Sequence, residues 1–172
     1  MEHLITIIIL IGMVGVVSLI VFLLIMEKSK GKVKDKKTYI GMYEANLSTL
    51  EKEVFTLINT YRVSLGLQPL ISNAFTSTVI CEPHVEYCIK LGYASHKNFP
   101  QRYNKIKDNI PTARISEIIS SGFHNPDSVV NGFRNSHDHN KSLVGDYTHM
   151  GISVKSDRNG KLYTCIINLK VK

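Results

Sequence analysis

The segment Pro126–Ile152, PDSVVNGFRNSHDHNKSLVGDYTHMGI, says most about which domain this chain contains. A helix is expected to start near Pro126 and Asp127, because proline in the first turn and an acidic residue behind it are typical of helix starts. Apolar residues at helical spacing follow: Val129, Val130 and Phe133. We expect a polar loop after this helix that presents His139, and then the entry to an apolar strand.

Two further helices are expected upstream of this segment. Ser48 and Glu51 form a capping-box pattern, and Gly66 ends the helical run that follows them. The apolar residues of this run are Leu50, Val54, Leu57, Ile58, Tyr61 and Leu65. A second helix is expected at about Asn73–Leu91, where Pro83 would kink it or shorten its first half.

Strand patterns alternate with these helices. Ala113–Ser120 is expected to form a strand, and a short helix is expected before it at Phe99–Lys107. Met150–Lys155 and Leu162–Val171 are expected to pair as a hairpin around an Asn-Gly turn. Helices interleaved with antiparallel strands predict a layered α+β domain over residues 45–172.

The N-terminal residues 1–26 are interpreted as a membrane anchor. Leu4–Met26 carries no charge, and at about 1.5 Å per residue a helix of this length spans the bilayer core of roughly 30 Å. A cleaved signal peptide is disfavoured because the apolar run is long, no Lys or Arg precedes it, and no small-residue cleavage site follows it. We therefore expect a single transmembrane helix that stays in the mature protein.

Residues 27–44 are interpreted as a basic linker. Six lysines between Lys28 and Lys37 face only Glu27 and Asp35, so residues 27–37 contribute +4 of the net charge of +7. This cluster suits anionic lipid headgroups, and the positive-inside rule would leave the following domain in the cytoplasm. The remaining charge is spread along the chain without an arginine and aromatic stripe, so nucleic-acid binding is not expected.

The chain has three cysteines, so at most one disulfide forms within it. Cys81 and Cys88 are seven residues apart on the expected second helix, about 10 Å between Cα atoms, which is too far for a disulfide. Either residue could pair with Cys165 if the fold brings them together. Free buried thiols are the alternative.

Candidate functional residues lie in three separate motifs. Glu117 shares one face of its expected strand with Ile115 and Ile119, so we expect its carboxylate to be partly buried and to need a partner. His96 and His139 follow the second and third helices, in loops of the kind that present functional side chains. His84 instead lies on the apolar stripe of the second helix and is expected to be a hydrogen-bonded core residue.

Six motifs of the chain, in their order, resemble the compact bacterial branch of the CAP superfamily: the cysteine-rich secretory, antigen 5 and pathogenesis-related-1 proteins. The resemblance covers about residues 51–169. The motifs are Glu53–Arg62 with Gly66–Leu70, His84-Val-Glu-Tyr, Ser95-His96-Lys-Asn-Phe with Arg102, Ser116–Gly122, Val129–His139 and Tyr147–Ile152.

This resemblance implies an α-β-α sandwich with a cleft that holds His96, Glu117 and His139, with Ser136 nearby. It implies that the imidazole and carboxylate groups converge to within about 4–8 Å, where two histidines hydrogen-bond the carboxylate. In some family members the two cleft histidines bind a divalent metal, often Zn²⁺, which would fall to His96 and His139. The chain departs from the family pattern at Ile118, Phe133, Asp138 and Asn140.

Three functions are compatible with these features. The first is a membrane-anchored binding module whose ligand is a lipid, a cell-envelope component or a protein, and the family resemblance favours it. The second is a metal-dependent hydrolase in which the His/Glu/His cleft holds Zn²⁺ and an activated water. The third is a degenerate scaffold in which His96, Glu117 and His139 only hydrogen-bond one another. Secreted relatives favour an extracytoplasmic domain, against the lysine pattern, and we expect that topology.

Overall fold

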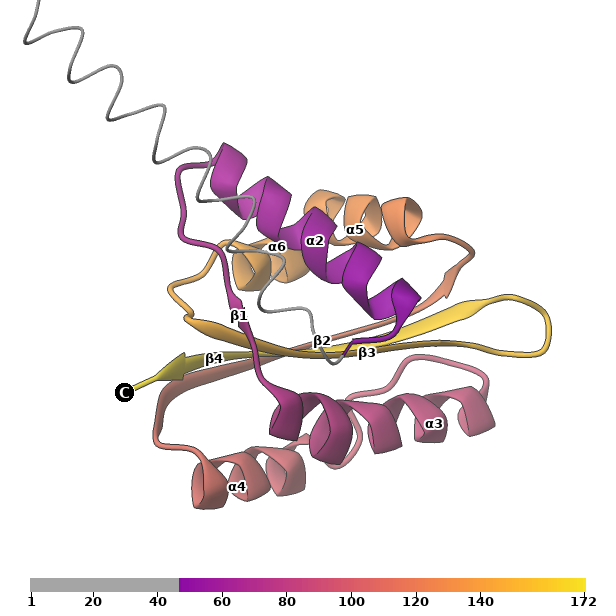
Figure 1. Cartoon of the computed structure of the whole chain (residues 1–172). Coiled ribbons are helices and arrows are strands. Elements are labelled where there is room, and N and C mark those ends of the chain that lie inside the picture. Colours follow the sequence, from indigo (N-terminus) through magenta and orange to yellow (C-terminus); the bar gives the residue numbers. More distant parts are fainter. Residues whose placement is uncertain (1–46) are drawn as a thin grey trace, which may run out of the picture. The chain divides into compact units, whose positions relative to one another are not determined.

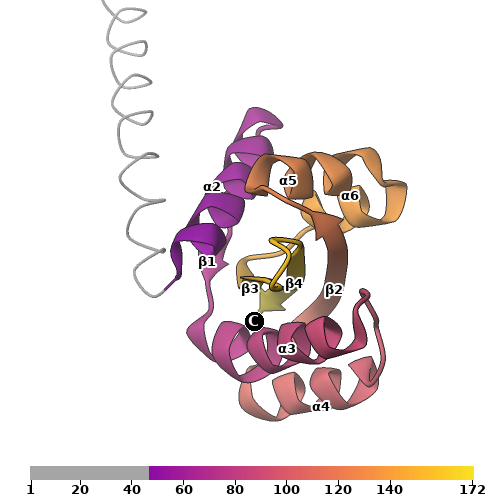
Figure 2. The same cartoon turned by 90° about the vertical axis from the view of Figure 1, so that its right-hand side faces the viewer.

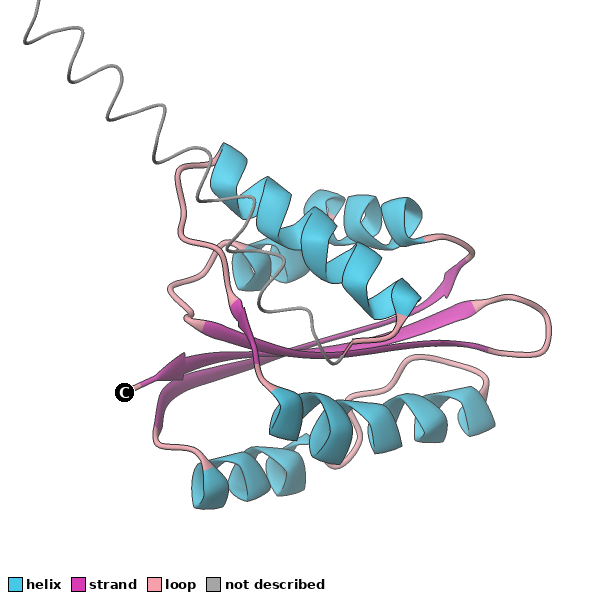
Figure 3. Ribbon diagram, in the orientation of Figure 1, coloured by secondary structure: helices cyan, strands magenta, loops and turns pink. Residues whose placement is uncertain are grey.

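The computed structural model describes residues 47–172, which form helices on both faces of one sheet (Figures 1 and 3). The helical elements are α2 (Thr49–Ser64), a π-helix η1 (Thr76–Cys81), α3 (Glu82–Leu91), α4 (Phe99–Asn109), α5 (Pro126–Asn135) and α6 (His137–Leu143). The strands are β1 (Ile71–Ser72), β2 (Thr112–Phe123), β3 (His149–Ser156) and β4 (Leu162–Val171).

The sheet has the strand order β1-β3-β4-β2, so β2 lies at one edge. The short strand β1 pairs with β3 in parallel, whereas β3 with β4 and β4 with β2 are antiparallel. Figure 2 shows α2, α5 and α6 on one face of the sheet and α3 and α4 on the other. The expected α+β class and α-β-α arrangement are therefore confirmed for the described residues.

Alternation along β2 separates two hydrophobic cores. Ile118 is buried in the core under α2 and α5, while Ile119 is buried in the core under α3 and α4, against which Ile115 also packs. Side chains two residues apart share a face of a strand. Glu117, between Ile115 and Ile119, therefore faces the α3 and α4 layer, as the sequence pattern predicts.

The expected helix at Asn73–Leu91 is resolved into two parts. Its first part is η1, whose last bond runs from the Glu82 backbone N–H to the Ser77 carbonyl, five residues earlier. Pro83 then stands in the first turn of α3, where a missing N–H costs no hydrogen bond.

The capping box expected at the start of the first helix is confirmed, because Ser48 and Glu51 each accept from the other's backbone N–H.

Helix α6 corrects the sequence-based expectation of a loop around His139. Ser136 has extended dihedral angles and therefore ends the helical run of α5. The seven residues of α6 follow it. The carbonyls of Leu143 and Gly145 at the end of this helix accept hydrogen bonds from Arg62 of α2, at 2.6 and 3.0 Å. Such tertiary bonds stabilise a helix that is too short to be marked by its own apolar periodicity.

The three cysteines are free and buried in the structure, so the disulfide alternative with Cys165 is wrong. Burial raises the pKa of the Cys165 thiol well above its usual range, and a hydrogen bond with the Cys81 side chain raises it further. These thiols therefore act as small core residues packed between the sheet and the helices η1 and α3.

The expected anchor at Leu4–Met26 and the linker at 27–44 lie outside the described residues. Within residues 47–172, no helix has the length and apolar character that a membrane span requires.

Candidate functional site

Glu117 is the centre of the site, because its carboxylate is buried and fully bonded. Its side chain is 2% exposed. The Arg102 guanidinium donates to both oxygens, from Nε to Oε2 at 2.7 Å and from Nη2 to Oε1 at 2.9 Å. His96 Nδ1 lies 2.8 Å from Oε1. This bidentate ion pair offsets the cost of burying the carboxylate.

The turn before α4 places Arg102 and His96 around the carboxylate. Asn98 adopts a left-handed conformation at φ 62°, which asparagine tolerates better than most residues, and the Phe99 N–H then donates back to the His96 carbonyl. Arg102, in the first turn of α4, also donates from Nη1 to the Lys97 carbonyl at 2.8 Å. The Arg102 guanidinium therefore fixes both the strand β2 and the turn that carries His96.

His96 is the exposed member of this group. Its side chain is 60% exposed, although its Nδ1 is bonded to Glu117. A carboxylate only accepts, so whenever the imidazole is neutral its hydrogen is on Nδ1, which leaves the lone pair on Nε2. The Glu117–Arg102 pair therefore orients a histidine nitrogen that is free to accept a hydrogen bond or bind a metal.

His139 approaches the same region from the other helical layer. It lies on α6, with its ring edge-on to Phe133 at 5.4 Å between ring centroids. Burial lowers the pKa of His139, and the charge of His96 lowers it further, while Asp138 opposes both. The two imidazoles are therefore within electrostatic reach of each other.

The structure brings the sequence-predicted site residues together in part. His96 and Glu117 are in direct contact, whereas the convergence of His139 with them stays a prediction, which the effect of the His96 charge on the pKa of His139 supports. Within residues 47–172, however, His139 makes no hydrogen bond to Glu117, and the carboxylate is satisfied mainly by Arg102. The Ser136 carbonyl accepts from the Asn140 N–H, which starts α6.

The pKa of His139 is lowered rather than raised. Burial, rather than attraction to a carboxylate, is the dominant influence on its pKa. Arg102 is the functional residue that the sequence pattern left unassigned. The expected burial of Glu117 could have pointed to it, because a buried carboxylate needs a cationic partner. The guanidinium of arginine can bond both carboxylate oxygens at once.

His84 is a buried, hydrogen-bonded residue, as expected, and its bond fixes the turn that carries His96. It is 5% exposed, and its Nε2 donates to the Ser95 carbonyl at 2.7 Å, next to His96. Burial lowers the pKa of His84, and the nearby Arg102 charge lowers it further. A neutral His84 therefore serves to position the turn.

The residues of the site fit a metal only in part. Among residues 47–172, no group of three or more His, Cys, Asp or Glu side chains is arranged to hold a metal ion. Glu117 is engaged by Arg102, so the remaining donors are the imidazoles of His96 and His139. The bond from His96 Nδ1 to a carboxylate does match the arrangement that orients metal-binding histidines in proteins.

Comparisons with known proteins agree on the domain. The model of the family described as "CAP: Cysteine-rich secretory protein family" matches residues 55–167. An outer surface protein from Borrelia burgdorferi is 26% identical, with a TM-score of 0.58 over 70% of this chain and 92% of that one. No curated protein matched the chain.

Two further solved structures share the fold. An extracellular protein with an SCP domain from Bacillus anthracis is 20% identical, with a TM-score of 0.60 over 70% of this chain and 40% of that one. A cysteine-rich secretory protein from Staphylococcus aureus is 19% identical, with a TM-score of 0.57 over 68% and 37%. The family match spans most of the described domain, and the sheet order and helical layers fit it, so this chain belongs to the CAP (cysteine-rich secretory protein) family.

Proposed function

We propose that the protein is a membrane-anchored binding module whose ligand contacts His96 and His139 beside Glu117. The observation that carries this proposal is the Glu117–Arg102 ion pair, which is buried and holds an exposed imidazole in one orientation. A recognition group held in place before binding loses little conformational entropy when the ligand arrives. The free Nε2 of His96 would accept a hydrogen bond from the ligand.

The proposed location is a membrane, with the domain on its extracytoplasmic side. Residues 4–26 would cross the bilayer, and the Lys28–Lys37 cluster would contact anionic headgroups. The similar proteins from Borrelia burgdorferi and Bacillus anthracis are described as an outer surface and an extracellular protein, which supports this side. The lysine cluster opposes it under the positive-inside rule. Protease cleavage of the domain in sealed, right-side-out vesicles would support the proposed topology, and protection would refute it.

A divalent metal such as Zn²⁺ is a second candidate ligand. The carboxylate bond to His96 Nδ1 favours it, because this bond leaves Nε2 as the coordinating atom. A bound Zn²⁺ would supply Lewis acidity and an activated water, the chemistry that a hydrolase requires. With two imidazoles as protein ligands, His96 and His139, at least one position would stay open. A scaffold without ligand or metal is the remaining alternative.

One set of variants separates these functions. The full-length chain would be compared with His96→Ala/His139→Ala in two measurements: zinc content after purification without added metal, and retention of components from an envelope extract. His137→Ala is the matched control, because His137 lies on α6 like His139 and its side chain is 91% exposed.

A component retained by the wild type and the control, and lost by the double variant, would support the binding module. Near-stoichiometric zinc lost only in the double variant would support the metal candidate. If the double variant behaves as the wild type in both measurements, the site is a scaffold, and the proposed function is wrong.

A further inference from the structure

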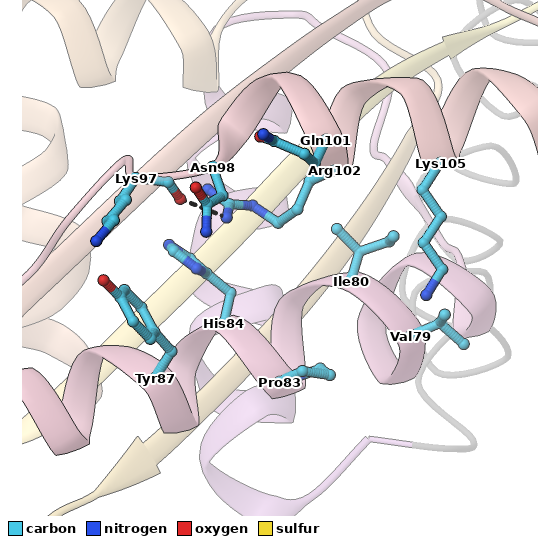
Figure 4. A pocket seen from close by; sticks show the side chains of 10 residues that line it. All are labelled: Val79, Ile80, Pro83, His84, Tyr87, Lys97, Asn98, Gln101, Arg102 and Lys105. Carbon is cyan, nitrogen blue, oxygen red and sulfur yellow. Dashed lines mark hydrogen bonds between the residues drawn. The ribbon is translucent and has the colours of Figure 1, made fainter.

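A cavity next to the histidine site lies between α3 and α4. Its volume is about 320 Å³, at the lower end of the range for small-molecule sites, which is about 300–1,000 Å³. Figure 4 shows α4 above it and the helical segment of η1 and α3 below it. Arg102 forms part of the wall, and its guanidinium is already held by Glu117 on its other side.

One end of this cavity is polar and positively charged. Tyr87, Lys97 and Asn98 lie toward that end in Figure 4. The lining contains no acidic residue. Neither Lys97 nor Lys105, the two lysines of the lining, forms an ion pair with any of residues 47–172. The positive charge of the cavity is therefore available for a ligand.

The Tyr87 hydroxyl is a second free group at the polar end. It makes no hydrogen bond with another residue of the described domain, while its ring stacks on His84 at 5.8 Å between ring centroids. His84 is fixed by the Ser95 carbonyl, so the stack holds Tyr87 in place. A hydroxyl donor beside an ammonium group suits an anionic oxygen.

The other end of the cavity is apolar. Its lining includes Val79, Ile80 and Pro83, and Lys105 extends toward Val79 in Figure 4. The methylene stem of a lysine covers apolar surface while its ammonium group stays in water. A ligand for this cavity therefore needs an apolar body as well as a negative charge.

We propose that the α3–α4 cavity binds a small amphiphilic anion, with an acidic head at Tyr87 and Lys97 and an apolar body against Val79, Ile80 and Pro83. The acidic head is a carboxylate or a phosphate, which share the chemistry of an anionic oxygen. Lys105 lies at the Val79 end, so its charge adds only a longer-range attraction for the anion. The cavity shares Arg102 with the histidine site, but the proposed anion does not contact the exposed face of His96.

The test uses the full-length chain in a fixed concentration of non-ionic detergent, titrated calorimetrically. The probes are 2-naphthoate, 2-naphthyl phosphate, inorganic phosphate and the neutral 2-naphthamide, which matches naphthoate in shape. We expect saturable binding of naphthoate, naphthyl phosphate or both, at least about tenfold tighter than the amide, since only the anions pair with the lysines. The affinities of 2-naphthoate and 2-naphthyl phosphate show whether the site prefers a carboxylate or a phosphate. Inorganic phosphate is expected to bind far more weakly, because it lacks the apolar body.

Variants locate the binding. Lys97→Gln and Tyr87→Phe should each weaken binding of the preferred anion by about fivefold. Val79→Phe should remove most of it by filling the apolar end, at a position that is only half-buried. Lys90→Gln is the matched control, because Lys90 is exposed on α3 and outside the cavity. His96→Ala/His139→Ala should leave the affinity unchanged.

Several results would overturn the proposal. They are no saturable binding of any anionic probe, equal affinity for 2-naphthoate and 2-naphthamide, inorganic phosphate binding as tightly as the naphthyl anions, and an equal loss in Lys90→Gln and Lys97→Gln. If only the His96 and His139 variants change the binding, the anion occupies the histidine site instead, and the α3–α4 proposal is wrong.

Discussion

The carboxylate of Glu117 and the guanidinium of Arg102 form the most buried ion pair in the described domain. Both side chains are largely buried, at 2% and 12% exposure, and the carboxylate has three bonds of 2.9 Å or less. Low exposure strengthens each bond but makes the loss of one partner costly, because the other charge then stays buried without compensation. The exposed His96 depends on this pair for its orientation.

Arg102→Met should destabilise the domain by about 3–5 kcal/mol, because the buried Glu117 charge would lose its ion pair and keep only the bond to His96. The double variant Arg102→Met/Glu117→Leu should be less destabilised than Arg102→Met alone, since neither charge remains. Urea unfolding of the full-length chain, followed by circular dichroism, measures both. Arg158→Met is the control, because Arg158 is exposed in the turn between β3 and β4. If the destabilisation of the double variant equals the sum of those of Arg102→Met and Glu117→Leu, the pairing is contradicted.

Stability should fall as the pH decreases below neutrality. Burial lowers the pKa of three histidines, His84, His139 and His149, so the folded state binds fewer protons than the unfolded state between the lowered values and about 6.5. The stability that these groups contribute is complete above about pH 6.5 and is lost as the pH falls through their folded pKa values. Urea midpoints between about pH 7.5 and about pH 5 measure this decline. His139→Gln should decline less steeply, and an unchanged slope in this variant would contradict its assigned role.

At the scale of elements, α2 determines where α6 lies. Arg62 of α2 is 2% exposed and donates to three carbonyls: Gln68 at 3.0 Å, Leu143 at 2.6 Å and Gly145 at 3.0 Å. The Tyr61 hydroxyl donates to Asn140 of α6 at 3.0 Å. These bonds satisfy the end of a short helix and fix the position from which His139 extends.

Arg62→Lys should cost about 1–3 kcal/mol, because one ammonium group cannot reach all three carbonyls in the geometry of the guanidinium fork. The NMR resonances of His139 should shift as α6 moves, while those of Glu117 should not. Arg134→Lys serves as the control. Arg134 lies over the Tyr61 ring at 4.5 Å, a contact that a lysine keeps, so we expect a change within about 0.5 kcal/mol. Equal effects of the two substitutions would show that Arg62 does not hold α6 in place.

At the scale of the whole molecule, the edge strand β2 lies between the two helical layers. Glu117 comes from β2, His96 from the turn before α4 in one layer, and His139 from α6 in the other (Figure 2). An edge strand leaves room beside the sheet for side chains from both layers to approach each other. The three residues that we propose to bind one ligand therefore come from both layers and from the edge strand.

Removal of residues 1–26 should release the protein from membranes. The basis is the uncharged length of Leu4–Met26, which suits a bilayer of about 30 Å, and the missing cleavage site after it. Alkaline carbonate extraction should leave the full-length chain in the pellet and the truncated chain in the supernatant. An intact mass that places the mature N-terminus near residue 27 would instead identify a cleaved signal peptide.

The sequence by itself determined the elements whose patterns are local. The capping box at Ser48 and Glu51, the β3–β4 hairpin and the burial of Glu117 between two isoleucines follow from spacing alone, and the ordered motifs indicated the family. These features depend on residues that are neighbours on one helix or strand, so their signal lies within a short window.

Only the tertiary structure decided which groups meet in space. The assignment of Arg102 as the main partner of Glu117, the helix at His139 and the free thiols each depend on residues far apart in the chain. The α6 helix is held by Arg62, about 80 residues upstream, so no local pattern predicts it. The physical reason is that burial and ion pairing are properties of assembled layers, whereas periodicity is a property of a single element.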